Sequence, residues 1–143
     1  MFNPFKNKKK TNTNKDEELL IKTACILVHA AKMDENYTEK EKLIIKNALK
    51  NLGMKDEVIN DSLAKAELIE KNSNQLLDFT KVIKNTETSF KVSLIEALWT
   101  IIYSDQNLDM YESNLMRRLS GLLYLDKKIV GDIKEKVKIK LNK

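Results

Sequence analysis

The amino-acid sequence predicts an all-α protein, a compact bundle of about seven helices. Its 143 residues include only three glycines and one proline, too few turn-forming residues for an all-β domain. Apolar residues make up 42% and charged residues 33% of the chain, a balance typical of a globular domain with one core. Apolar residues also recur at helical spacing in successive segments, and short polar links separate these segments.

The first half of the chain is predicted to form four helices. The first is apolar almost all round from Ala24 to Ala31, which marks a helix that neighbours bury on several sides. Thr38 and Glu41 have the spacing of a capping box and start the second helix. Gly53 suits the C-terminal cap of that helix. The four predicted ranges are 16–33, 38–52, 56–70 and 75–83.

The second half is predicted to form three helices. Asp109 and Glu112 repeat the capping-box spacing at the start of the middle one. Gly121 and Gly131 lie inside helical patterns, where glycine costs stability, and close approach of neighbouring helices is the expected compensation. The three predicted ranges are 89–104, 109–123 and 126–141.

The net charge of +5 is concentrated at the two ends of the chain. Residues 1–15 hold five lysines and no acid, whereas residues 16–126 hold 14 basic against 19 acidic residues. A basic body would indicate nucleic-acid binding, so no nucleic-acid partner is predicted. Residues 1–15 are predicted to be a disordered basic tail, and residues 16–143 the folded domain. Phe2 and Phe5 leave open a contact of this tail with an anionic membrane surface.

The sequence also predicts a cytoplasmic location. No apolar run approaches the roughly 18 residues that cross a bilayer, and the N-terminal segment has no apolar signal region. A single cysteine, Cys25, rules out an internal disulfide framework.

The two halves of the chain match at an offset of 71 residues without a gap. A match of this length indicates an internal repeat of two helix–loop–helix units. Neither unit can bury its central apolar helix alone, so the units are predicted to pack together with the first and fifth helices at the centre. The matching polar positions are Asp34 and Asp105, Asn36 and Asn107, Thr38 and Asp109, and Glu41 and Glu112.

Two segments, AAKMDENYTEKE and IIYSDQNLDMYESNLMRRLSGLL, resemble the paired signature of the tellurite-resistance TerB family. That signature is a small apolar or aromatic run, Asp-Gly, a short gap, and a Glu at the start of the next helix. The similarity covers about residues 20–135, and Glu35 and Gln106 stand where the family has glycine. The resemblance implies an all-helical, non-enzymatic domain, a role in a stress response, and cation binding by acidic residues.

The acidic loops are the candidate metal site, mainly because of this resemblance. If the two loops lie together, a divalent cation shared by their carboxylates relieves the repulsion between them. The structural alternative is that the same residues only form capping boxes and Asx-turns. An EF-hand is excluded because Met110 and Met116 stand where it needs Gly and Glu. The candidate ligands are Asp34, Glu41, Asp105, Asp109 and Glu112.

Catalytic chemistry is not predicted. Cys25 and His29 share a helix face, but two ligands are too few for a structural zinc site, and no oxyanion donors accompany them as a nucleophile pair. They are interpreted as a core cysteine beside a satisfied histidine. The chain also lacks P-loop, Rossmann, G-x-S-x-G and H-E-x-x-H motifs.

The second half also contains aromatic and basic residues whose roles the sequence suggests. Trp99 and Tyr103 are expected to pack in the core. The last helix is basic and amphipathic, so it suits a membrane or polyanion surface, or it simply exposes its lysines. Four further basic residues suit phosphate or acidic partners, or form a solvated face: Arg117, Arg118, Lys127 and Lys128.

The predicted function is therefore that of a cytoplasmic, non-catalytic domain that binds a partner protein, a divalent cation, or both. A homo-oligomer is compatible with the sequence. The alternative is an adaptor held at a membrane or polyanion by its basic ends.

Overall fold

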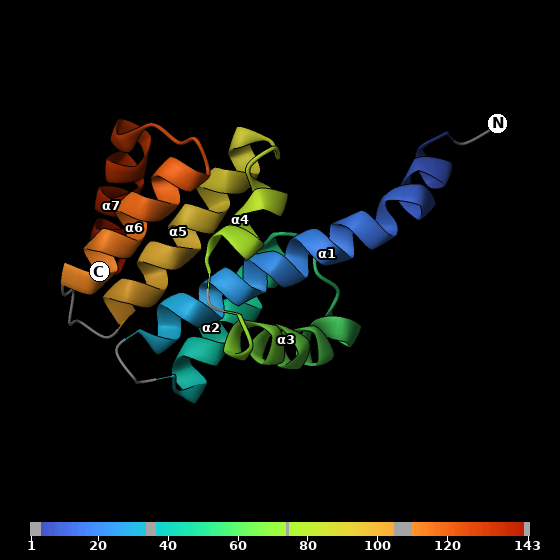
Figure 1. The fold of residues 1–143 in the computed structure, drawn as a ribbon, viewed down its shortest axis with the longest axis horizontal. Helices are drawn as coiled ribbons and strands as arrows, with labels where there is room; N and C mark the ends of the chain where they lie inside the picture. The colour runs from blue at the N-terminus through green and yellow to red at the C-terminus, as the bar shows by residue number, and fades with distance from the viewer. Residues whose placement is uncertain (1–3, 34–36, 74, 105–109, 142–143) are drawn as a thin grey trace.

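The computed structural model of the chain describes residues 4–33, 37–73, 75–104 and 110–141. These residues form seven helices and no strand, so the predicted all-α bundle is confirmed (Figure 1). The helices are α1 (Pro4–Lys32), α2 (Glu39–Asn51), α3 (Asp56–Lys71), α4 (Leu77–Ile83), α5 (Thr88–Ser104), α6 (Met110–Leu122) and α7 (Lys127–Leu141).

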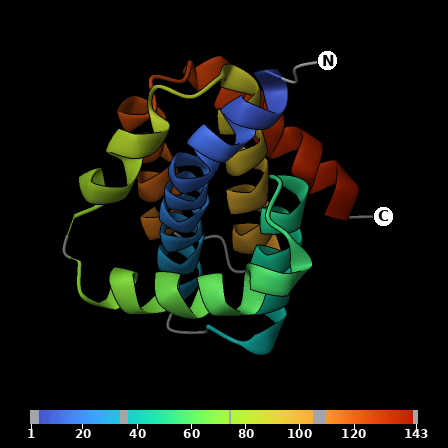
Figure 2. The ribbon, with the colours of Figure 1, turned by 90° about the vertical axis from the view of Figure 1, so that its right-hand side faces the viewer.

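Helices α1 and α5 occupy the centre of the bundle. α1 packs against α2, α3, α4 and α5, and α5 also packs against α2 and α7. Figure 2 shows α1, in blue, in the middle of the other helices. The side chains from Ala24 to Val28 in α1, and Leu94, Ile95 and Leu98 in α5, are fully buried. Each buried Leu or Ile contributes about 1.5–3 kcal/mol relative to an exposed one, so these two apolar helices hold the bundle together.

Local signals in the sequence set most helix ends. α2 to α7 begin and end within two residues of the predicted ranges. The capping box of Thr38 and Glu41 is present. Gly53 has a φ of 114° after α2, and the Met54 N–H donates to the Leu49 carbonyl oxygen at 2.9 Å, as a Schellman cap requires. Among the described helices, none is long and apolar enough to cross a membrane.

The predicted start of the first helix near Asp16 is wrong, because α1 begins at Pro4. Proline suits the first helical position, and no further proline or any glycine follows before residue 16 to end the helix. The N-terminal part of α1 projects beyond the bundle (Figure 1). The division of the chain into a basic tail (1–15) and a domain (16–143) stays a prediction.

One expectation about packing is also wrong. A Cβ added at Gly121 or at Gly131 would meet no atom within 4 Å, so neither glycine is there to allow a close helix approach.

Candidate functional site

The start of α2 lies beside the end of α5. The Lys40 Nζ donates a hydrogen bond to the Ser104 carbonyl oxygen at 2.9 Å, and α2 packs along α5. Ser104 ends α5, where carbonyl groups lack helical partners, so the lysine satisfies one of them. This contact joins the residues that follow the first acidic loop to the residue that precedes the second one.

Glu41 is the one predicted cation ligand whose side chain the structure describes, and it is completely buried. Its Oε1 accepts hydrogen bonds from the backbone N–H and from the hydroxyl of Thr38, both at 2.7 Å. Its Oε2 is also buried and has no hydrogen-bond partner among the described residues. A buried polar atom without a partner carries a free-energy cost, so this oxygen is the exception in an otherwise satisfied cap.

The other four predicted ligands cannot be placed. Asp34, Asp105 and Asp109 lie outside the described residues, and Glu112 lies in α6 but its side chain is not described. Among the side chains that are described, no three His, Cys, Asp or Glu residues gather closely enough to hold a metal ion.

A polar network joins α1 to α3 next to the first acidic loop. The Lys32 Nζ donates to the Glu70 Oε1 at 2.9 Å, and the His29 Nδ1 lies 3.1 Å from the Glu70 Oε2. Burial raises the pKa of the Glu70 carboxyl, but the hydrogen bonds with Lys32 and His29 outweigh it, so this pKa lies below its ordinary value of 4.5. Glu70 is therefore a carboxylate that ties the end of α1 to the end of α3.

Glu67 extends this network to the residue that follows the loop. The Tyr37 hydroxyl donates to the Glu67 Oε2 at 2.5 Å, and the Lys42 Nζ lies 3.7 Å from the same oxygen. Burial, followed by the hydrogen bond to Glu67, raises the pKa of the Tyr37 hydroxyl well above its ordinary value of 10.0. Tyr37 therefore remains a neutral donor, and the first loop is anchored at its C-terminal end.

Sequence reasoning missed Glu67 and Glu70. A signal was present, because they stand three residues apart on one helix and His29 and Lys32 stand three residues apart on another. Residues at this spacing share a helix face. The charges could be paired only once it was known that α1 packs on α3.

A scan against protein-family models matches residues 20–135 to the family described as tellurite resistance protein TerB. The chain belongs to the TerB family. A search of curated proteins and a search of solved structures returned no match. The match covers most of the chain, from within α1 to within α7, and includes both acidic loops.

In this TerB domain, Cys25 and His29 contact different partners and do not form a nucleophile pair. Cys25 is fully buried, and its Sγ donates to the Ala66 carbonyl oxygen at 3.6 Å. Burial raises the pKa of this thiol to about 11, so it stays protonated and unreactive near neutral pH. His29 pairs with Glu70 instead. The interpretation of a core cysteine beside a satisfied histidine agrees with this geometry.

Proposed function

We propose that this TerB domain is a non-catalytic module that binds a divalent cation between its two acidic loops and presents the bound form to a protein partner. The observation that carries the proposal is the Glu41 carboxylate, which is buried and whose Oε2 has no hydrogen-bond partner within the described part of the chain. An oxygen atom in this state is ready to coordinate a hard cation, and Ca²⁺ and Mg²⁺ prefer oxygen ligands.

The contact between Lys40 and Ser104 supports the shared site. It holds the start of α2 beside the end of α5, and the two loops are attached at these points. A cation there would offset the repulsion of nearby carboxylates and draw the two helix–loop–helix units together. The residues that would hold it are Asp34, Glu41, Asp105, Asp109 and Glu112.

The non-catalytic part of the proposal is supported by the state of Cys25. This thiol is the best nucleophile in the chain by residue type, yet burial raises its pKa to about 11 and no solvent reaches it. A nucleophilic cysteine needs the opposite environment, electropositive and partly exposed.

An amide NMR titration of the full chain with Ca²⁺, Mg²⁺ and Mn²⁺ tests the cation site. We expect shifts, or paramagnetic broadening by Mn²⁺, confined to the two acidic loops and the first turns of α2 and α6. Asp105→Asn and Glu41→Gln should each weaken binding. Glu67→Gln is the matched control, because Glu67 is an acid near the first loop that belongs to the network with Tyr37. Spectra that do not change at millimolar ion would overturn the cation proposal.

The second candidate function, an adaptor at a membrane or polyanion, is favoured by the end of α7. Ile139 and Leu141 are 61% and 45% exposed and alternate with lysines in the last turn. Exposed apolar side chains among lysines are typical of a helix that lies on an anionic lipid surface. This adaptor should sediment with phosphatidylglycerol vesicles at low salt and lose binding when Ile139 and Leu141 are changed to Ser or when residues 1–15 are removed. Full-length protein that stays in the supernatant excludes it.

A further inference from the structure

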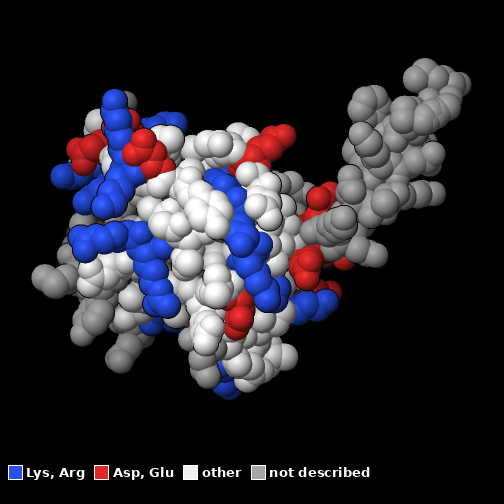
Figure 3. Space-filling view, turned by 45° about the horizontal axis from the view of Figure 1, so that its top comes forward, with Lys and Arg blue, Asp and Glu red and all other residues white. Residues whose placement is uncertain are grey.

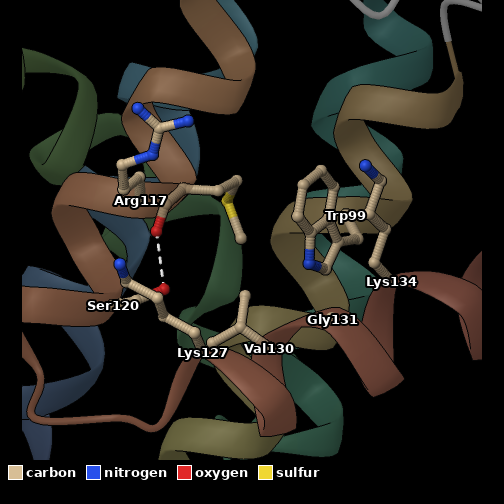
Figure 4. A pocket seen from close by; sticks show the side chains of 8 residues that line it. Trp99, Arg117, Ser120, Lys127, Val130, Gly131 and Lys134 are labelled. Carbon is tan, nitrogen blue, oxygen red and sulfur yellow. Dashed lines mark hydrogen bonds between the residues drawn. The ribbon is translucent and has the colours of Figure 1, made fainter.

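A groove lies where α5, α6 and α7 meet. Its volume is about 610 Å³, within the range of small-molecule sites. Figure 4 shows residues of α6 along one side and Trp99 with Lys134 along the other. Glu41, the one candidate cation ligand whose side chain is described, does not line it. Its lining residues are Trp99, Met116, Arg117, Ser120, Lys127, Val130, Gly131 and Lys134.

The lining of the groove is cationic. Arg117, Lys127 and Lys134 line it, and no acidic residue does among the side chains that the structure describes. None of the three forms an ion pair with the part of the chain that the structure describes. Figure 3 shows Lys and Arg side chains on the left, where Figure 1 places α6 and α7, with Asp and Glu among the upper ones and a further basic stripe nearer the centre. Cations on both sides of one groove favour an anionic ligand.

The groove also has an unpaired donor. Trp99 is 4% exposed, and its Nε1 is buried with no hydrogen-bond partner among the described residues. A buried indole N–H usually has an acceptor. Met116 also lines the groove, and an unbranched side chain of this kind changes rotamer readily. The Lys134 Nζ lies 5.2 Å from the centroid of the Trp99 ring, so the Lys134 ammonium and the Trp99 side chain lie on the same side of the groove.

Gly131 leaves this groove open. Glycine inside a helix lowers stability relative to alanine, and close helix packing does not explain Gly131, since a Cβ there would meet open space. Gly131 lines the groove, so any larger side chain at this position would occupy part of it. The first turn of α7 also lines the groove through Lys127 and Val130, and its positive helix end adds to the attraction for an anion.

We propose that this groove binds a phosphate ester, with the phosphate between Arg117, Lys127 and Lys134 and the organic part against Trp99. Arginine matches phosphate oxygens with two parallel hydrogen bonds. Three cations suit a phosphate, which carries up to two negative charges, better than a single carboxylate. The phosphate belongs either to a small soluble molecule or to a lipid headgroup, and the two sources are separated by the test below.

Trp99 is the only tryptophan in the chain, so its fluorescence reports on the groove in the full-length protein. The soluble probe is AMP, with adenosine as the control without phosphate. The lipid probe is a phosphatidylcholine vesicle containing phosphatidylglycerol, with pure phosphatidylcholine as its control. Ionic strength is kept constant with chloride. A saturable change with AMP identifies a soluble phosphate ester, and a change with the anionic vesicle alone identifies a headgroup. No change with either probe overturns the proposal.

Substitutions at adjacent positions separate the groove from general charge attraction. Arg117→Gln and Lys134→Gln should each weaken binding of the active probe about tenfold, the value of one charge-assisted hydrogen bond. Arg118→Gln is the matched control, because Arg118 is exposed and does not line the groove. It should change the affinity less than about twofold. Equal losses for Arg117→Gln and Arg118→Gln would overturn a specific site.

A second pair of variants tests the groove by filling it. Gly131→Leu should block binding at least about tenfold, since the side chain enters space that the ligand needs. Gly121→Leu is the control, because it makes the same change inside α6 at a residue that does not line the groove. Far-ultraviolet circular dichroism checks that both variants are folded. Binding that survives Gly131→Leu in a folded protein overturns the proposal.

Discussion

The first half of the bundle (α1 to α3) and the second half (α5 to α7) have matching helices but different polar contacts. α2 and α6 begin 71 residues apart and also end 71 residues apart, and α3 and α7 begin at the same offset. Many apolar positions match at this offset, but the buried Leu49 and Leu63 correspond to Ser120 and Lys134. The equivalence of the two units as whole structures stays a prediction.

The C-terminal caps show the same geometry built from different residues. After α2, Gly53 has a φ of 114°, and after α6, Tyr124 has a φ of 59°. Met54 N–H donates to Leu49, and Leu125 N–H donates to the carbonyl oxygen of Ser120, each at 2.9 Å. The hydrogen bonds of the cap therefore do not depend on glycine, although glycine reaches a positive φ at lower cost.

The ion pairs between helices differ more. Glu70 of α3 contacts His29 and Lys32 of α1 at 3.1 and 2.9 Å. In the second half the charges are exchanged, with Glu96 on α5 lying 3.8 Å from both Lys136 and Lys140 on α7. These lysines are largely exposed, so the second contact is weaker. The comparison teaches that the two halves share helix positions and cap geometry, whereas the ion pairs between their helices differ.

Substitutions of buried leucines should have the largest effect, and they test whether the two halves share one core. Leu27 and Leu98 correspond at the 71-residue offset, and both are fully buried. Leu27→Ala and Leu98→Ala should each lower the free energy of unfolding by about 2–5 kcal/mol, measured by urea denaturation. One cooperative transition in both variants is expected. Two separate transitions, or a loss in only one variant, would break the comparison.

The capping boxes should give the next largest effect. Glu41→Ala removes both hydrogen bonds that the Glu41 Oε1 accepts from Thr38, so it should lower the free energy of unfolding by about 1–2 kcal/mol. Glu112→Ala should cost as much if Asp109 and Glu112 form the same box. If Glu112→Ala leaves the free energy of unfolding unchanged, the capping box is present only in the first half. Urea titration of both variants at neutral pH decides between these results.

Exchanging the cap residues sharpens the comparison further. Tyr124→Gly relieves a non-glycine residue at positive φ and should raise the free energy of unfolding by up to about 1 kcal/mol. Gly53→Ala introduces that strain and should lower it by about 1 kcal/mol. Thermal denaturation of both variants measures the two changes. Shifts of the same sign would contradict the assignment of one cap geometry to both helices.

The smallest expected effect concerns the ion pairs. The pKa of Glu70 is lowered in the folded protein, so its contribution is present above its ordinary value of 4.5 and is lost as the pH falls below it. Glu70→Gln should therefore cost about 1 kcal/mol at pH near 7 and nothing in acid. Glu96→Gln, with its longer and more exposed contacts, should cost less. Urea titrations across the acid range compare the two, and a pH-independent loss in Glu70→Gln would contradict the linkage.

Most of the fold could be predicted from the sequence because its signals are local. Thr38, Glu41 and Gly53 mark helix ends within a few residues of themselves, and helical periodicity separates the core from the surface. The start of α1 could not be predicted, because a polar segment without a helix breaker has no signal that fixes its conformation.

The candidate sites depend more on tertiary structure. Glu41 was chosen from its spacing, but the burial of its Oε2, without a partner among the described residues, can be seen only in the folded structure. The groove at Trp99 joins residues from three helices, and neither Arg117 nor Lys134 has a sequence pattern that distinguishes it from a solvated residue. Spacing along one helix predicts which residues share a face, whereas a groove requires the relative positions of several helices.

The position of Cys25 has a further consequence for measuring the dynamics of this protein. Its thiol is closed off by the contact between α1 and α3, and it is the only cysteine in the chain. An alkylating reagent can modify it only when these two helices separate or the whole protein unfolds. The rate of modification therefore reports on opening of the first half without any introduced label. Its dependence on urea distinguishes local opening from global unfolding.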